Sequence, residues 1–119
     1  MITEFVFWLK DIVEDDPLPY EISSICFCYV QNGMAKTLMM GGCEFRPKIN
    51  YLFDYYPLEA QYFDCKLLRQ FENEKSFKQL ICQVIDESFA DDYLKKEFYG
   101  KKIYFGEYNK RLKYLFTVK

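Results

Sequence analysis

The stretch EISSICFCYVQNGMAKTLMMGGCEF, residues 21–45, decides the fold. Residues 21–30 are rich in β-branched and aromatic side chains and are apolar on both faces, which predicts a strand covered on both sides for much of its length. Asn32-Gly33 follows, and this pair favours a tight hairpin because a type I′ turn needs positive φ twice. Residues 34–45 are then the returning strand, in which Gly41-Gly42 predicts a bulge or kink.

Upstream of this hairpin, apolar side chains in residues 2–13 recur at the spacing of one helix face, which predicts an amphipathic helix that ends before Pro17. Downstream, residues 49–56 are either a third short strand or an aromatic loop. Residues 57–72 favour a helix, because Pro57 suits a first helical position and good helix formers dominate. Alternation at Phe63, Cys65 and Leu67 leaves a strand open there.

Two further helices are predicted before the C-terminal region. Ser76 and Gln79 have the spacing of a capping box, and apolar side chains follow at helical spacing as far as Ile85. The segment 88–91 has the pattern of another N-terminal cap and opens a short helix that stops near Gly100.

Residues 101–118 predict a second hairpin with its turn near Asn109-Lys110. On its last strand, period two places Tyr114 and Phe116 toward the core and Lys113 toward water. Strands grouped with strands and helices with helices indicate an α+β fold. We therefore expect one domain, residues 1–119, with a mainly antiparallel sheet built from the two hairpins and packed with three to four helices.

Composition points to a cytoplasmic protein. Half of the 119 residues are hydrophobic, yet no run approaches the 18 apolar residues of a membrane-spanning helix. The first residues have no basic segment followed by a small-residue cleavage site, so no secretory signal is expected. The odd count of five cysteines then indicates reduced thiols in a cytosol.

Three of the cysteines suggest two interpretations. Cys26 and Cys28 share one face of the predicted strand and could form half of a thiolate metal site with Cys43. The preferred interpretation is that they are small apolar core residues, because zinc sites usually use paired C-x₂₋₄-C knuckles. No metal or cofactor is therefore predicted.

No residue is assigned a catalytic role. The sequence has no histidine, which removes Ser-His-Asp and Cys-His catalysis, and it has no dinucleotide, P-loop, kinase or EF-hand pattern. Carboxylate pairs occur at Asp15-Asp16, Asp86-Glu87 and Asp91-Asp92, but neighbours on a helix point about 100° apart and suit solvated helix ends. A non-enzymatic role is favoured.

Charge is distributed unevenly along the chain. Residues 1–94 have 8 basic and 16 acidic side chains, whereas residues 95–119 have 8 basic and 2 acidic ones. Basic residues that alternate with aromatic rings suit nucleic acid, through phosphate neutralisation and base stacking. The candidate nucleic-acid surface consists of Lys101, Lys102, Lys110, Arg111 and Lys113. The acidic pI near 5.2 favours the alternative that these residues form the outer face of a mixed-charge surface.

The leading functional hypothesis is a small binding or inhibitory protein that occupies a surface of a partner protein. Its size and acidity are those of immunity and anti-defence proteins, an analogy of size and charge alone. Acidic patches would favour association with a basic partner, and buried aromatic anchors would supply affinity. The candidate partner surface consists of Phe7, Trp8, Glu14, Asp15, Asp16, Tyr51, Tyr55 and Tyr56. The alternatives are nucleic-acid binding through the C-terminal hairpin, and a small-ligand or histidine-independent enzymatic role in an aromatic pocket.

Overall fold

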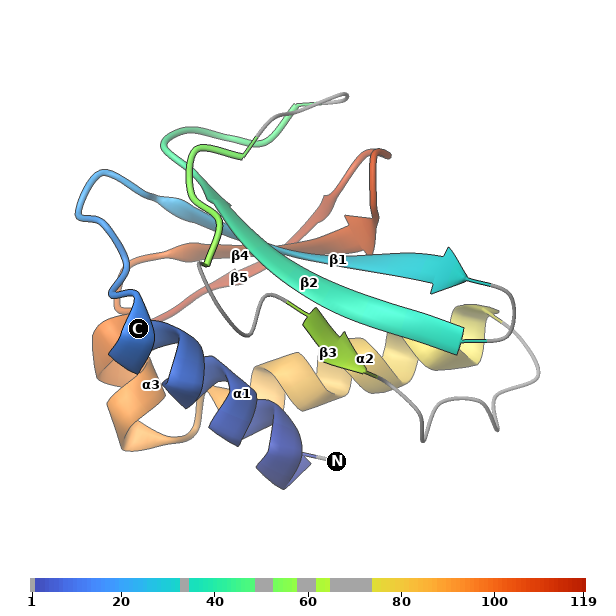
Figure 1. The fold of residues 1–119 in the computed structure, drawn as a ribbon, viewed down its shortest axis with the longest axis horizontal. Helices are drawn as coiled ribbons and strands as arrows, with labels where there is room; N and C mark the ends of the chain where they lie inside the picture. The colour runs from blue at the N-terminus through green and yellow to red at the C-terminus, as the bar shows by residue number, and fades with distance from the viewer. Residues whose placement is uncertain (1, 33–34, 49–52, 58–61, 65–73) are drawn as a thin grey trace.

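The predicted central strand runs through the middle of a five-stranded sheet in the computed structural model of the protein (Figure 1). The structure describes residues 2–32, 35–48, 53–57, 62–64 and 74–119. Along the chain the elements are α1 (Ile2–Asp15), β1 (Ser24–Asn32), β2 (Ala35–Cys43), β3 (Tyr62–Asp64), α2 (Glu74–Ser88), α3 (Asp92–Glu97), β4 (Lys102–Glu107) and β5 (Lys113–Thr117).

The strand order across the sheet is β3-β2-β1-β4-β5. Three of the four pairings between these strands are antiparallel, as predicted, and β1 with β4 is the parallel one. The hairpin predicted at Asn32-Gly33 is present, with Asn32 opposite Ala35 as its closing pair, while Gly33 lies outside the described residues. Because β4 lies parallel to β1, the chain must cross the sheet between them, and α2 and α3 are on that path.

The three described helices lie together on one face of the sheet (Figure 1). α1 and α2 present the apolar stripes that their spacing predicted, and these stripes pack on the side chains of β1, β2 and β4 that point the same way. The fully buried side chains of this layer are mostly aromatic or branched aliphatic and include Phe5, Leu9, Ile12, Phe27, Tyr29, Leu38, Phe77, Ile81 and Ile85. The density of rings in the sequence therefore fills this core.

The helix starts differ from those predicted. Ser76 lies inside α2, which begins at Glu74, and Ser88 ends that helix rather than opening the next. The Ser88 hydroxyl donates to the carbonyl of Val84, a bond within the helix. Asp91 is the N-cap of α3 and accepts a hydrogen bond from the backbone N–H of Leu94. A carboxylate is the stronger competitor for this position because it also complements the helix dipole.

The structure decides between interpretations at two places from residue 41 to residue 72. Residues 62–64 form β3 on the edge of β2, which is the strand that the alternation left open and not the preferred helix, while residues 58–61 and 65–73 lie outside the described residues. The pairing of β1 with β2 is unbroken through Gly41-Gly42, so there is no bulge. Both glycines instead leave room for an aromatic side chain. The ring of Phe53 lies against Gly41, and Tyr55 lies near Gly42 and pairs with it through a backbone β-bridge. The described part of residues 49–56 is thus a loop with one bridge.

Candidate functional site

The second face of the sheet has no helix of the described chain over it (Figure 1). Alternation along the strands directs Cys26, Cys28, Met39 and Tyr104 to this side, where they form a small apolar cluster of their own. We call this side the open face. The four side chains are themselves buried, so the accessible surface on this side belongs to the residues around the cluster.

Two loops border the open face. The first is described at residues 44–48 and 53–57, where Phe53 covers Gly41 of β2, and the second is the turn at 108–112, where Leu112 approaches Gly106 of β4. Between the loops lies a hollow of about 410 Å³, whose lining residues are Arg46, Pro47, Lys48, Arg111 and Leu112. A second hollow of about 450 Å³ adjoins it and is lined by Arg46, Lys102, Tyr104, Leu112 and Tyr114. The two hollows share Arg46 and Leu112, and we call them together the basic groove.

Tyrosine rings line one end of this groove. Tyr104 and Tyr114 meet edge to face, with ring centroids 5.7 Å apart. Tyr104 is buried, whereas Tyr114 is 48 % exposed, and its hydroxyl lies 2.7 Å from the hydroxyl of Thr117. One aromatic face in this pair is therefore accessible to a ligand while its position is fixed by its neighbours.

Tyr114 does not point into the core as predicted. The register between β4 and β5 shifts at Ile103 and Tyr104, which pairs Tyr104 with Tyr114 but Ile103 with Phe116. Tyr114 consequently lies on the open face, whereas Phe116 packs against Phe89 on the helical side. A bulge breaks the strict alternation on which the prediction rested.

The five residues of the candidate nucleic-acid surface do not lie together on one surface. Lys102 and Arg111 are exposed and line the open-face groove. Lys113 is exposed but lies on the helical side of the sheet, and Lys110 is held 2.7 Å from the Glu107 carboxylate. Lys101 is half-buried and donates to the carbonyl of Ile22, and burial lowers its pKa.

Two groove cations were not among the predicted site residues. Arg46 and Lys48 belong to the segment 46–48, which the sequence marked only as a break before the next element. In the folded chain Lys48 lines one hollow with Arg111, and Arg46 lines both that hollow and the one that includes Lys102. Local sequence patterns contain no signal for this juxtaposition, apart from the presence of two cations beside a proline.

The predicted partner surface is also divided. Phe7 is 63 % exposed on the outer side of α1, and Glu14 and Asp15 are exposed at its C-terminal end, with Asp16 half-buried. Trp8 is only 7 % exposed, because its indole packs on Phe27 and other core rings, so it is not an accessible anchor.

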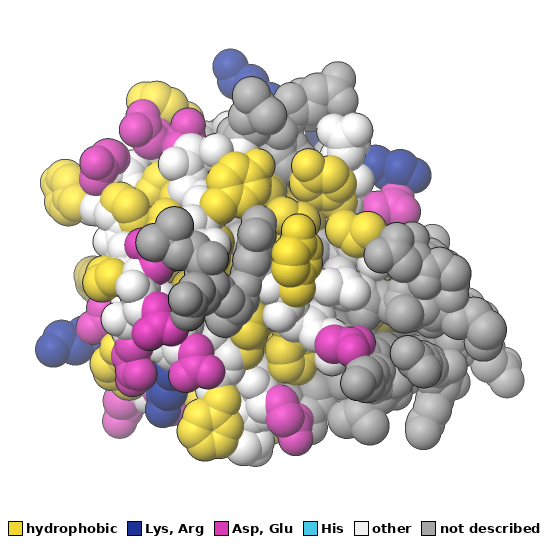
Figure 2. All heavy atoms as spheres, viewed as in Figure 1, with side chains coloured by type: hydrophobic (Ala, Val, Ile, Leu, Met, Phe, Trp, Pro, Cys, Tyr) yellow, Lys and Arg dark blue, Asp and Glu magenta, His cyan; other side chains and the backbone are white. Residues whose placement is uncertain are grey.

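The three tyrosines of the predicted partner surface have different positions. Tyr55 is buried at 6 % exposure, and its hydroxyl donates to the carbonyl of Asp16 at 2.7 Å. Tyr56 is 39 % exposed and meets Phe53, and Tyr51 lies outside the described residues. Figure 2 shows acidic side chains gathered over the region of α1 and α3. The exposed acidic residues Glu14 and Asp15 of α1 and the basic groove therefore belong to separate surfaces.

The thiols under the open face form a buried cluster. Cys26, Cys28 and Cys43 are each at most 5 % exposed. The thiol of Cys26 shares a hydrogen bond with Cys43, and this bond together with burial raises the pKa of Cys26. Across the described ranges, no group of three or more Cys, Asp or Glu side chains is placed to hold a metal ion. These thiols fill space beneath the groove.

The described helices include none that is both long enough and apolar enough to cross a lipid bilayer. Comparison of the chain with protein-family models, with curated proteins and with solved structures finds no match.

Proposed function

We propose that the protein binds single-stranded nucleic acid along the open face of its sheet. The observation that supports this most strongly is the hollow in which Arg46 and Lys102 lie together with the exposed ring of Tyr114. Lys48 and Arg111 line the adjoining hollow, which also includes Arg46. Cations that follow a groove neutralise phosphates, and an exposed ring beside them stacks on an unpaired base. Of the surfaces described, this one has cationic side chains and an exposed aromatic ring within the same hollow.

The exposed ring favours a single strand over a duplex, because only unpaired bases are free to stack on it. The groove lies between two loops on the face of the sheet without a described helix, above strand side chains that are themselves buried. Tyr104 supports Tyr114 from the side, so the exposed ring keeps its orientation when a base stacks on it. Four cations correspond to about four phosphates, and a contact of that size gives a salt dependence with a slope of about −3 in log K against log salt.

Fluorescence anisotropy with a labelled oligothymidylate tests this proposal. We expect Tyr114→Ala to weaken binding about tenfold, because base stacking on an aromatic ring contributes about 1–3 kcal/mol, and Tyr114→Phe to retain it. We expect Arg46→Gln or Arg111→Gln to reduce the salt slope by about 0.7 each. Lys95→Gln, on the exposed side of α3, is the matched control and should leave both quantities unchanged. Binding that does not depend on salt, or that Lys95→Gln weakens equally, would reject the proposal.

A second candidate function is binding of a basic protein partner through α1. Its support is Phe7, a large apolar side chain that is 63 % exposed about two helical turns before the acidic residues Glu14 and Asp15 of α1. Apolar anchors beside charged rims are common in protein interfaces, where the charges mainly accelerate association.

Co-purification from the native host after nuclease treatment tests this second function. A stoichiometric partner that binds the wild type but not Phe7→Ser would support it. Tyr20→Ser is the matched control, because Tyr20 is even more exposed and lies outside α1. A partner that both variants retain would not use this surface.

A further inference from the structure

Two side-chain hydroxyl groups meet at the tyrosine end of the basic groove. The hydroxyls of Tyr114 and Thr117, both on β5, lie 2.7 Å apart and share a hydrogen bond. Residues three apart on a regular strand point to opposite faces, so this contact requires a departure from regular geometry. The register shift supplies it, because Lys102 pairs with Thr117 while Tyr104 pairs with Tyr114. The bulge therefore brings both hydroxyls to the open face, and we call them the hydroxyl pair.

A cation and an aromatic ring flank the hydroxyl pair. Lys102 is exposed and lies directly opposite Thr117 on β4, and side chains in such positions are neighbours. Lys102 also lines the same hollow as Tyr114, whose ring is 48 % exposed. The hydroxyl pair thus lies between an ammonium group on one side and a ring that can accept a stacked base on the other.

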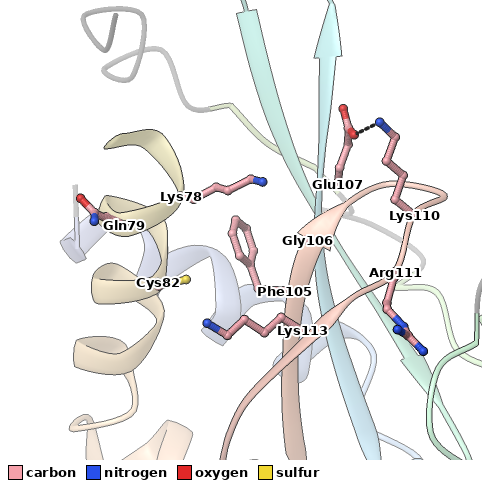
Figure 3. A pocket seen from close by; sticks show the side chains of 9 residues that line it. All are labelled: Lys78, Gln79, Cys82, Phe105, Gly106, Glu107, Lys110, Arg111 and Lys113. Carbon is pink, nitrogen blue, oxygen red and sulfur yellow. Dashed lines mark ion pairs between the residues drawn. The ribbon is translucent and has the colours of Figure 1, made fainter. Parts of the chain in front are cut away.

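The other side of the β4–β5 hairpin lacks this combination. Figure 3 shows the cleft of about 690 Å³ between α2 and the hairpin, in which Lys113 extends toward α2 and Arg111 points away from it. The ring on this side, Phe105, is only 4 % exposed, and Lys110 is paired with Glu107. The described lining of the cleft has no hydroxyl side chain. The hydroxyl pair and the accessible ring therefore belong to the open face.

The hydroxyl pair can bind a third hydroxyl. Each hydroxyl has one O–H donor and acceptor lone pairs. The bond between Tyr114 and Thr117 uses one of the two hydrogens, which leaves one donor and further lone pairs for a ligand. A ribose 2′-hydroxyl is itself both a donor and an acceptor, and it is the group by which a protein distinguishes RNA from DNA.

The order of these side chains matches the order of groups in a ribonucleotide. The 2′-hydroxyl is on the sugar carbon between the one that holds the base and the one that holds the 3′-phosphate. A base stacked on Tyr114, with its 3′-phosphate at Lys102, would therefore direct the 2′-hydroxyl to the hydroxyl pair. We propose, on the basis of the nucleic-acid binding proposed above, that the strand in the basic groove is RNA and that Tyr114 and Thr117 recognise its 2′-hydroxyl.

Fluorescence anisotropy with labelled oligouridylate, oligodeoxyuridylate and 2′-O-methyl oligouridylate of equal length tests the proposal. The three strands have the same bases and the same number of phosphates, so their affinities differ through the 2′ position. We expect RNA to bind about fivefold more tightly than DNA, the effect of one net hydrogen bond. The 2′-O-methyl strand should bind no more tightly than DNA, because the methyl group removes the donor.

Two variants separate the hydroxyls from the rest of the groove. Thr117→Val removes one hydroxyl at nearly constant shape, and Tyr114→Phe removes the other while it keeps the ring. Each should reduce the RNA preference to less than about twofold and leave DNA affinity unchanged. Thr37→Val is the matched control, because Thr37 of β2 is not among the described lining of either hollow. It should retain the fivefold preference.

The outcomes distinguish this proposal from nucleic-acid binding itself. Equal affinity for RNA and DNA would overturn the RNA assignment while nucleic-acid binding stands. No binding of either strand would reject both. A preference that persists in Thr117→Val and Tyr114→Phe would show that the hydroxyl pair does not recognise the 2′-hydroxyl. Equal losses of RNA and DNA binding in Thr117→Val would show that Thr117 only supports the fold, and circular dichroism would reveal the structural change.

Discussion

The ring of Phe53 occupies the space that a side chain at position 41 would need. A Cβ atom built on Gly41 would lie 2.2 Å from Cδ2 of Phe53 and 2.6 Å from two further ring atoms. Gly41 is therefore required for the close approach of Phe53 to β2. This contact holds one wall of the basic groove against the sheet.

We expect Gly41→Ala to destabilise the protein by about 3 kcal/mol, because the ring or the loop must move to relieve the overlap. Urea denaturation measures the change. Phe53→Ala alone costs about 3 kcal/mol through lost burial. The double variant should lose at least 1 kcal/mol less than the sum of the two, because removal of the ring relieves the overlap. Additive losses would show that the methyl group is accommodated without displacing Phe53.

Gly100 should respond to substitution for a different reason. Its φ is +79°, and no atom lies within 4 Å of a Cβ built there. Gly100→Ala should therefore cost about 1 kcal/mol through backbone strain alone. Gly100→Asn should cost less, because Asn tolerates the left-handed region. Equal stability of all three proteins in urea denaturation would contradict this explanation.

The Asp91 carboxylate should give α3 a measurable dependence on acid. Its bond from the Leu94 N–H, with Lys10 at 3.0 Å, lowers the pKa of Asp91. A lowered folded-state pKa contributes stability that is present above about pH 4, the unfolded value, and that is lost as the pH falls through the folded pKa.

We expect Asp91→Ala to cost about 1 kcal/mol at pH 7 from loss of the cap. Asp91→Asn keeps the cap and should differ from the wild type by a few tenths of a kcal/mol. Urea denaturation at pH 7 and pH 3 measures both. If the wild type loses no more stability than Asp91→Asn between these pH values, the carboxylate does not contribute as described.

Tyr55 should make the free energy of unfolding fall as the pH rises into the alkaline range. Burial raises the pKa of this phenol above its ordinary value of 10.0, and its hydroxyl donates to the Asp16 carbonyl. A raised folded-state pKa contributes stability that is fully present below about pH 10 and is lost as the pH rises toward the folded value.

Tyr55→Phe should therefore cost about 1 kcal/mol at pH 7, the net contribution of one hydrogen bond. The difference from the wild type should shrink above about pH 10, as the unfolded wild type ionises. Tyr99→Phe, at a 70 % exposed position, is the control. A difference that stays constant from pH 7 to pH 11 would contradict the linkage.

Local patterns predicted the elements whose stabilising contacts are near in sequence. The stripe of residues 2–13 and the apolar residues of α2 identified two helices, because each repeats its own spacing over several turns. The hairpin at Asn32-Gly33 and the C-terminal hairpin were also predicted, since each pairs neighbouring strands. The α+β class follows from these elements.

Features that depend on distant contacts were not predictable in this way. Tyr62–Asp64 has helix-forming neighbours, and it becomes a strand because the edge of β2 offers backbone partners. Arg46 lines the groove from a segment in which the Asp54 carboxylate accepts a hydrogen bond from the backbone N–H of Glu44, ten positions earlier. Tyr114 faces the groove because a bulge shifts the register of β5. Each outcome depends on a partner far away in the chain, which periodicity does not record.

The parallel pairing of β1 with β4 has a consequence for synthesis on the ribosome. β1 is the central strand, yet its second edge is covered only when β4 emerges, and the contact of Lys101 with Ile22 joins positions 79 apart. Until then, a nascent chain exposes the unpaired edge of an apolar strand, a template for association with other chains. Such long-range closure is slow. We therefore expect yield during expression to depend on chaperones that shield this edge.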